Sequence, residues 1–215
     1  MMINLEKENS SRADLRKRIV RTSMEAFATR GVKSVTMDDV AMMLGISKRT
    51  LYEVFEDKET LLIECLSDHH DQMVVFMREV LETSTNVLEV ILKGYKKTIE
   101  DYRGTNIRFL QEIKKYPKVY ELVRNHRKRD HDAAVAFFKK GVEQGLFRTD
   151  VNFSIVHLLV HEQLDLLMTN ELFTQYSFME VYESITFTFL RGVSTAKGAT
   201  ILEDFLIEYK SKNEF

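Results

Sequence analysis

The chain has 215 residues, 44% of them hydrophobic and 30% charged, with a formal net charge of −2. These values are ordinary for a folded soluble protein, and they exclude a polycation. The single cysteine, Cys65, excludes an intramolecular disulfide framework and is typical of a reducing cytoplasm. We therefore expect a folded cytoplasmic protein.

Neither a signal peptide nor a membrane span is expected. The first eight residues are charged and contain no apolar core. No apolar run approaches the ~18 residues that are needed to span a bilayer. One proline and eight glycines leave few places to turn, which favours long helices over many short strands. The sequence thus predicts an all-α protein that makes no contact with a membrane.

Positive charge gathers near the N-terminus. Between Ser11 and Phe55 nine residues are basic and five are acidic, whereas the whole chain is slightly acidic. A basic region of this kind on a nearly neutral body is what a DNA-binding domain needs.

Four helices are predicted in the first eighty residues. Their apolar residues recur at helical spacing, and a side chain that can accept hydrogen bonds from backbone amides precedes each start. The first helix is expected over about 11–30. The expected starts are a capping box at Ser11–Asp14, then Thr36, Ser47 and Asp57, and the expected stops include Gly31 and Gly45.

Longer amphipathic helices follow. We expect them at about 57–82, 86–103, 105–115, 117–143, 152–174 and 178–196, with a short one near 200–210. The sequence therefore predicts a helix-turn-helix domain over 11–65, with its motif at about 37–56. A larger helical ligand-binding and dimerisation domain is expected over 66–215.

Three residues within 37–56 meet the packing demands of a helix-turn-helix. Its two helices cross over a short turn, so the facing residue on the first helix must be small, as Ala41 is. Gly45 suits the turn, which needs a residue that tolerates positive φ. Leu51 returns an aliphatic side chain to the shared core. The spacing of these three residues therefore predicts the crossing.

The other face of the second motif helix is polar and basic, as a helix that reads the major groove should be. An ordinary helical hairpin with a capped turn is the alternative interpretation of the same pattern. The residues of this polar face are Ser47, Lys48, Arg49, Thr50 and Tyr52.

A longer motif covers the same segment. Its residues follow the pattern Leu-Tyr-x-x-Phe-x-x-Lys-x-x-Leu, at Leu51, Tyr52, Phe55, Lys58 and Leu61, with Ile19, Ala26, Phe27, Gly31 and Thr36 upstream. Over about its first 65 residues the chain resembles the tetracycline-repressor (TetR) family of bacterial regulators. The segment 141–148 is also similar to the turn that precedes the two dimerising helices of that family.

The resemblance implies roles for single residues. Thr36 would contact a phosphate at the start of its helix, and Tyr52 and Lys58 would contact further phosphates. Lys48, Arg49 and Thr50 would face the groove, with Ser47 beside them at the start of the helix. Glu53 would repel phosphate unless it points away or pairs with Arg49.

Two apolar helices near the C-terminus are expected to form a homodimer. In the family, the last two long helices pair with their copies in a four-helix interface. Burial within one monomer is the alternative. The apolar residues that suggest the interface are Ile155, Val156, Leu159, Val160, Leu164 and Leu167 in 152–174, with Phe178, Val181, Ile185, Phe189 and Val193 in 178–196.

Other patterns carry less information. His157 and His161 stand at i, i+4 on one helix, but no third ligand accompanies them, so we expect a packed or interface pair and no metal. No cofactor motif is present. A basic stretch is interpreted as a solvated face or a second nucleic-acid patch: Lys114, Lys115, Lys118, Arg124, Arg127, Lys128 and Arg129. A stripe of larger residues is interpreted as core or as an apolar pocket wall: Met73, Phe76, Met77, Tyr95, Tyr102, Phe109, Phe137 and Phe138.

We expect a transcriptional repressor that leaves a palindromic, double-stranded operator when a small apolar or amphipathic effector binds. It would work in the bacterial cytoplasm, associated with the nucleoid. A DNA-binding activator or a spatial marker on the chromosome is the alternative. A non-DNA helical protein or enzyme is a further alternative, but we predict no enzyme, because the sequence contains no phosphate loop, cysteine–histidine cluster or nucleophile elbow.

Overall fold

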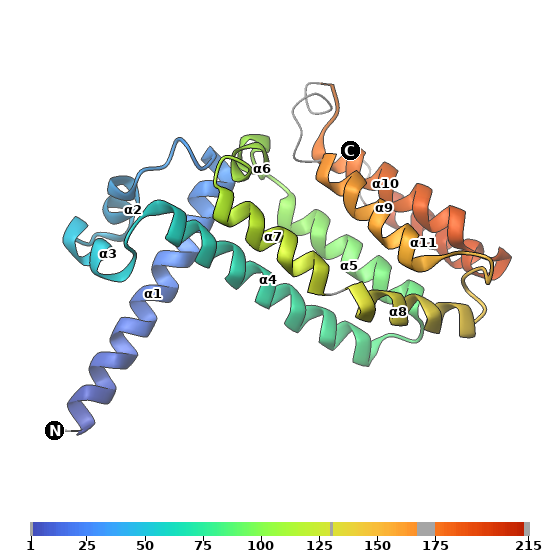
Figure 1. Cartoon of the computed structure of the whole chain (residues 1–215), viewed down its shortest axis with the longest axis horizontal. Helices are drawn as coiled ribbons and strands as arrows, with labels where there is room; N and C mark the ends of the chain where they lie inside the picture. Colours follow the sequence, from blue (N-terminus) through green and yellow to red (C-terminus); the bar gives the residue numbers. More distant parts are fainter. Residues whose placement is uncertain (1, 130, 167–174, 213–215) are drawn as a thin grey trace. The chain divides into compact units, whose positions relative to one another are not determined.

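The computed structural model describes residues 2–129, 131–166 and 175–212. These residues form eleven helices and no strand, apart from one isolated bridge between Phe147 and Ser194 (Figure 1). The expected all-α class is confirmed. Among the described helices, none combines the length and the apolar character that crossing a membrane requires.

The chain divides into two compact units. Unit 1 contains the residues up to Val74 together with Gly104–Val123, and unit 2 contains the rest. The helices of unit 1 are α1 (Met2–Arg30), α2 (Met37–Leu44), α3 (Lys48–Val54), the first part of α4 (Lys58–Thr83), α6 (Ile107–Ile113) and the start of α7 (Pro117–Arg129). The helices of unit 2 are the end of α4, α5 (Val87–Tyr102), the end of α7, α8 (His131–Glu143), α9 (Phe153–Leu166), α10 (Phe178–Val193) and α11 (Ala196–Lys212).

Helix α1 begins earlier than the sequence pattern predicted. It starts at Met2, so the expected capping box at Ser11–Asp14 lies inside the helix and caps nothing. The residues before Ser11 include neither proline nor glycine and are mostly compatible with a helix. Nothing therefore stops the helix at the point where the hydroxyl and the carboxylate suggested a start.

The next three starts are where the sequence predicts them. Thr36 caps α2 in a full capping box with Asp39, and Gly45 ends that helix at a left-handed φ of 65°. Ser47 caps α3, accepting a hydrogen bond from the amide of Thr50. Asp57 accepts the amide of Thr60 at 2.7 Å, in the first turn of α4.

One of the later helix predictions needs correction, and two others extend beyond the described residues. The helix expected over 117–143 is described as α7 and α8, on either side of residue 130, which lies outside the described residues. The helix expected near 200–210 is longer, since α11 spans Ala196–Lys212. Of the helix expected over 152–174, α9 is described to Leu166, and 167–174 lie outside the described residues.

The core of unit 2 is aromatic. Tyr95 is almost fully buried, stacks on Tyr182 with ring centroids 5.8 Å apart and meets Phe187 edge-on at 4.8 Å. Burial raises the pKa of Tyr95 well above its usual range, so its hydroxyl stays protonated. A Cβ added at Gly141 would lie 2.2 Å from the ring of Phe147, which explains why this helical position carries glycine. Of the predicted stripe, Tyr95 and Phe109 are buried, and Phe137 and Phe138 pack against the core of unit 2.

Candidate nucleic-acid interface

Helices α2 and α3 form the expected helix-turn-helix. Ala41 and Leu51 are buried between them, at 2% and 0% exposure, and Val40 is buried beside them. The turn is closed by hydrogen bonds from the Ile46 amide to the Ala41 carbonyl at 3.0 Å and from Gly45 to Met42 at 3.2 Å. The small side chain, the left-handed glycine and the inward leucine thus have the packing roles that their spacing predicted.

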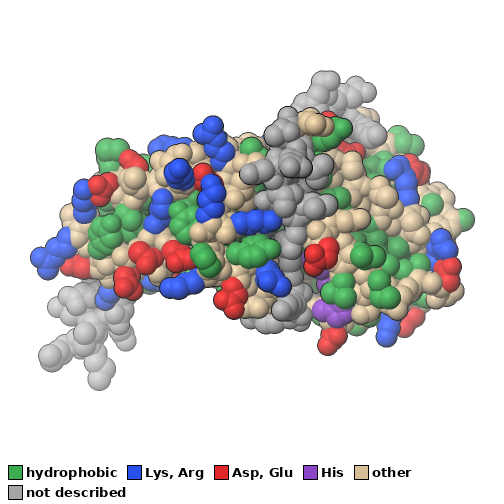
Figure 2. All heavy atoms as spheres, turned by 45° about the horizontal axis from the view of Figure 1, so that its top comes forward, with side chains coloured by type: hydrophobic (Ala, Val, Ile, Leu, Met, Phe, Trp, Pro, Cys, Tyr) green, Lys and Arg blue, Asp and Glu red, His purple; other side chains and the backbone are tan. Residues whose placement is uncertain are grey.

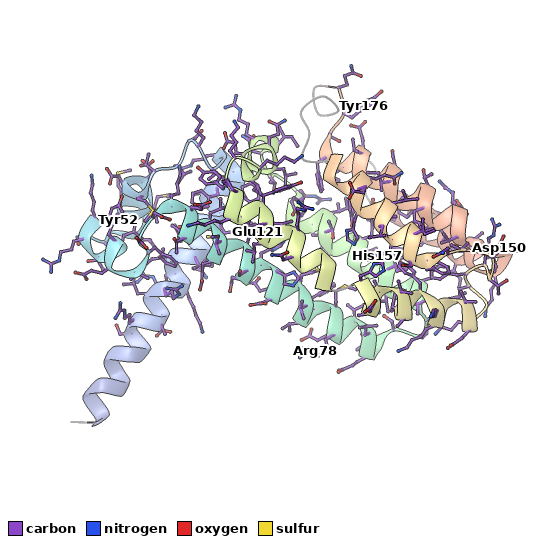
Figure 3. The ribbon with its side chains drawn as sticks, viewed as in Figure 1. Tyr52, Arg78, Glu121, Asp150, His157 and Tyr176 are labelled. Atoms are coloured by element: carbon purple, nitrogen blue, oxygen red, sulfur yellow. The ribbon has the colours of Figure 1, made fainter. Side chains whose placement is uncertain are left out.

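The opposite face of α3 is exposed. The side chain of Arg49 is 89% exposed, that of Lys48 is 66% exposed, and Tyr52 is half exposed (Figure 3). Ser47 is exposed beside them, and its hydroxyl lies 2.8 Å from that of Thr50. Five of the seven predicted DNA contacts therefore lie on one short helix and its cap, and their polar groups face outward.

Both cations of this face are paired with carboxylates. Lys48 contacts Asp38 of α2, and the Nε atom of Arg49 donates to Glu53 Oε1 at 2.9 Å. Glu53 thereby follows one of the two alternatives that the sequence left open, since it pairs with Arg49. Exposed ion pairs of this kind contribute little to stability, because water screens both charges. A phosphate or a base edge could replace these carboxylates at little cost.

Thr36 lies at the N-terminus of α2. Its hydroxyl donates to Asp39 Oδ2 at 2.6 Å and accepts the Asp39 amide at 3.1 Å. These bonds lower the pKa of Asp39, because the side chain and the backbone amide of Thr36 both donate to its carboxylate. The structure thus gives Thr36 a capping role, and its predicted phosphate contact remains a prediction.

Lys58 differs from Lys48 and Arg49 because its ammonium binds backbone carbonyls and not a carboxylate. Its Nζ atom donates to the carbonyls of Val32 and Val35, both at 2.9 Å. Burial lowers the pKa of Lys58, against the opposing effects of Glu112 and Asp39. A phosphate contact by Lys58 would have to compete with both carbonyls.

Two arginines of α1 support α3, and sequence reasoning missed them. Arg12 Nη2 donates to the carbonyl of Glu53 at 3.2 Å, and Arg16 Nη1 donates to that of Val54 at 3.5 Å. Both carbonyls belong to the last turn of α3, where no intrahelical donor remains. The guanidinium of Arg16 also lies 4.5 Å from the ring centre of Phe55 and pairs with Glu64. The i, i+4 spacing of the two arginines was the available signal.

Helix α9 of unit 2 carries an apolar surface. Ile155, Leu158 and Leu159 are each more than half exposed. Figure 2 shows hydrophobic side chains gathered near the histidines on this unit. An exposed apolar face on a folded domain is typical of a protein interface. The side chain of Leu164 and the whole of Leu167, which were named with these residues from the sequence, lie outside the described residues.

The two histidines of α9 are joined by a third from α8. His157 Nδ1 lies 3.0 Å from His131 Nδ1, and His157 Nε2 lies 2.9 Å from His161 Nε2 (Figure 3). Because the ring nitrogens face one another in two separate pairs, this arrangement does not converge on a single ion. Within the described part of the chain, no group of three or more candidate ligands is placed to hold a metal.

The second basic stretch is described only in part. Lys114 lies 5.8 Å from the ring centre of Tyr120, whereas the side chains of Arg127, Lys128 and Arg129 lie outside the description. A surface pocket of about 690 Å³ opens in unit 2 between α8 and the segment 149–154. Phe153 is the one aromatic residue in its wall, and the remaining lining includes the charged residues Lys139, Glu143 and Asp150.

Comparison with known proteins finds similarity to bacterial transcriptional regulators. The profile described as "Bacterial regulatory proteins, tetR family" matches residues 19–65. The HTH-type transcriptional repressor KstR2 of Mycolicibacterium smegmatis is 27% identical over 158 residues, covering 71% of this chain and 77% of the relative. The uncharacterized HTH-type transcriptional regulator YvaF of Bacillus subtilis is 33% identical over 101 residues, covering 46% and 53%.

Solved structures share the fold. A putative transcriptional regulator from Saccharomonospora viridis, in complex with choline, aligns with a TM-score of 0.68 at 20% identity, covering 85% of this chain and 99% of the other. The ketosteroid transcriptional regulator KstR2 of Mycobacterium tuberculosis aligns with a TM-score of 0.55 at 20% identity, covering 84% and 95%.

Proposed function

This chain belongs to the TetR family of bacterial regulatory proteins and is a DNA-binding transcriptional regulator, and we propose that it is a repressor that a small molecule releases from a palindromic operator. The main support for this proposal is the exposed basic face of α3, which the packing of buried Ala41 and Leu51 holds in a fixed orientation. The relatives named KstR2 are transcriptional repressors, which supports the same direction of regulation.

The proposed contacts are of two kinds: contacts with phosphates, which position the protein on the duplex, and contacts with base edges, which recognise the sequence. Thr36, Tyr52 and Lys58 contact phosphates and set the register of the protein on the duplex. Lys48, Arg49 and Thr50 enter the major groove, where Arg49 can donate to two acceptors of a guanine. Ser47 stays at the start of α3, where its hydroxyl accepts the amide of Thr50.

A homodimer through α9 and α10 completes the proposal. One reading helix per chain suffices if a two-fold axis presents two of them to the two halves of a palindrome. The exposed apolar residues of α9 support this interface, because they would otherwise remain in water. The DNA-binding domain is proposed over 11–65 and the ligand-binding and dimerisation domain over 66–215.

The effector is proposed to bind to the larger domain and to favour a dimer whose reading helices no longer match the operator. Choline in the related Saccharomonospora structure supports a small ligand, and so does the ketosteroid regulator among the relatives. An apolar or amphipathic effector is proposed for this chain. Because the operator lies on the chromosome, the protein would work in the cytoplasm at the nucleoid. No enzymatic role is proposed, since the relatives are regulators.

The test is a gel-shift titration with the DNA upstream of the gene for this chain and with duplexes selected by the protein from a random library. We expect one sequence-specific complex that resists competitor DNA and weakens steeply with salt, as released counterions require. Failure to form any such complex at low salt would overturn the proposal.

An activator is the second candidate. The HTH-type transcriptional activator FasR of Mycolicibacterium smegmatis is 30% identical over 112 residues, which is the observation in its favour. The two candidates differ in where the bound sites lie and in the effect of deleting the gene. Sites that overlap the promoter, with increased transcription after deletion, support the repressor, whereas upstream sites with decreased transcription support the activator.

A further inference from the structure

Helix α6 of unit 1 carries a buried carboxylate. Glu112 is only 8% exposed, and Oε2 accepts a hydrogen bond from the Lys33 amide at 2.7 Å. A carboxylate that leaves water without compensating partners carries a large desolvation penalty. The short, charge-assisted bond to the amide provides part of that compensation.

The partner of Glu112 is the loop between α1 and α2. Gly31 adopts a left-handed φ of 84°, and a Cβ added there would lie 3.1 Å from Glu112 Oε2. The carboxylate therefore approaches the loop backbone where only glycine leaves room without strain.

Lys58 holds the same loop from another helix. Its ammonium donates to the carbonyls of Val32 and Val35, while its charge interacts favourably with Glu112. The loop 31–35 is thus bound at two kinds of backbone group: Glu112 accepts from one amide, and Lys58 donates to two carbonyls. The residue that follows Val35 is Thr36, the cap of α2.

Helix α6 is itself fixed to α1. The amide of Asn106, its N-cap, donates to the carbonyl of Ala28 at 2.7 Å, and the Asn106 side-chain amide reaches the carbonyl of Thr29 at 3.4 Å. Both carbonyls belong to the C-terminal turn of α1, where intrahelical donors have run out. Glu112 is therefore presented from a helix that the end of α1 holds in place.

We propose that Glu112 is a positioning residue of the DNA-binding site: through the Lys33 amide it fixes the loop 31–35, and through that loop the place of Thr36 and the N-terminus of α2. This inference rests on the proposed function. Glu112 touches no DNA, and its effect is on how well the phosphate-binding end of α2 is preorganised.

The sign of its effect separates positioning from simple charge. Removing a carboxylate from a DNA-binding domain reduces repulsion of the phosphates, so charge alone predicts equal or tighter binding. Positioning predicts weaker binding, because the Lys33 amide loses its acceptor and the loop gains freedom. Glu121, an exposed residue of α7 in the same unit, provides the matched control (Figure 3).

The experiment measures fluorescence-anisotropy binding of a duplex that the wild-type protein selects from a random library. The proteins are wild type, Glu112→Ala, Glu112→Gln and Glu121→Ala, each titrated at several salt concentrations. We expect about a tenfold loss of affinity for Glu112→Ala, because the part-buried amide of Lys33 loses its acceptor. Glu112→Gln, which keeps an oxygen acceptor, should recover most of the loss, and Glu121→Ala should bind at least as tightly as wild type.

The dependence on salt gives a second readout. Because Glu112 makes no phosphate contact, the slope of log affinity against log salt should equal that of wild type. A shallower slope would mean that a cation–phosphate contact was lost instead, which would overturn the assignment to Thr36. Binding by Glu112→Ala as tight as that of Glu121→Ala would overturn it as well.

If wild type binds no duplex from the library, the proposed function and this inference are both overturned. If wild type binds a duplex and Glu112→Ala binds it as tightly as Glu121→Ala does, only this inference is overturned. If Glu112→Ala does not fold, amide hydrogen exchange in the wild type decides. Slow exchange of the Lys33 amide supports the proposal, whereas exchange at the rate of an unprotected loop amide contradicts it.

Discussion

Arg49 and Glu53 form a hydrogen-bonded ion pair on the exposed face of α3, with 2.9 Å between Nε and Oε1. Both side chains remain exposed, so the pair leaves the guanidinium of Arg49 accessible from solvent. It also places a carboxylate on the surface that the proposed function presents to phosphates. The residue best suited to read a base is therefore paired internally before DNA arrives.

Removing this carboxylate should strengthen DNA binding. Glu53→Ala frees Arg49 and eliminates a negative charge from the interface, and we expect about a threefold gain, since surface pairs of this kind are individually weak. Anisotropy with a selected duplex measures the change. Glu56→Ala, which removes an exposed carboxylate just after α3, is the control and should gain less. Unchanged or weaker binding by Glu53→Ala would mean that the pair holds Arg49 in its reading orientation.

Arg16 should contribute to the stability of unit 1. It donates to the end of α3, pairs with Glu64 and covers the ring of Phe55. Because the side chain is partly exposed, we expect Arg16→Ala to lower the free energy of unfolding by about 1 kcal/mol. Urea denaturation measures it. Arg18→Ala, which removes an exposed arginine from the same helix, should change stability by less than half as much, and equal effects would show that the contacts with α3 contribute nothing.

Glu89 should make the stability of unit 2 depend on pH in the acid range. Its pKa falls to about 2, because Lys93 and the backbone and hydroxyl of Thr85 donate to its carboxylate. Because the pKa of Glu89 is lower in the folded protein than in the unfolded chain, where it is about 4.3, its ionised form stabilises the native state at pH values above 4.3. This contribution is lost as the pH falls through the pKa of the folded protein.

The stability difference between wild type and Glu89→Gln should therefore be constant above about pH 5 and shrink as the pH falls from 5 toward 2. Denaturant unfolding of both proteins across that range provides the measurement. Glu82→Gln, which changes an exposed glutamate of α4, is the control. A difference between wild type and Glu89→Gln that does not change with pH would rule out this ionisation as its source.

The exposed apolar face of α9 should support the dimer. Leu158→Asp places a charge on that face, where it would lose water on association, so we expect monomers at concentrations at which wild type is dimeric. Sedimentation velocity distinguishes the two states. Ile207→Asp, at an exposed apolar position of α11, should remain dimeric. Dimeric Leu158→Asp beside monomeric Ile207→Asp would move the interface to α11.

The sequence predicted best those features that neighbouring residues determine. Thr36, Gly45 and Ser47 act within a few residues of themselves, and each caps its helix as expected. The Ala41–Leu51 crossing was predictable for the same reason, because its residues lie ten positions apart. The helix start predicted at Ser11 was wrong, because the residues before Ser11 are themselves helical and α1 begins at Met2.

Contacts between distant residues were not predictable. Glu112 and Lys33 are 79 positions apart, and no periodic pattern associates α6 with the loop before α2. The sequence likewise gave no indication that Lys58 binds two carbonyls or that His131 reaches His157, because tertiary packing determines both. Nor did the sequence show that Arg12 and Arg16 of α1 bind the end of α3.

DNA binding by the exposed face of α3 can be measured by anisotropy titration of a selected duplex. The proteins are wild type, the double variant Lys48→Ala/Arg49→Ala, and Lys140→Ala, which removes a control cation from unit 2. We expect at least a tenfold loss of affinity and a shallower salt dependence for the double variant, and unchanged binding by the control. Equal affinity of all three proteins for the duplex would contradict DNA binding by this face.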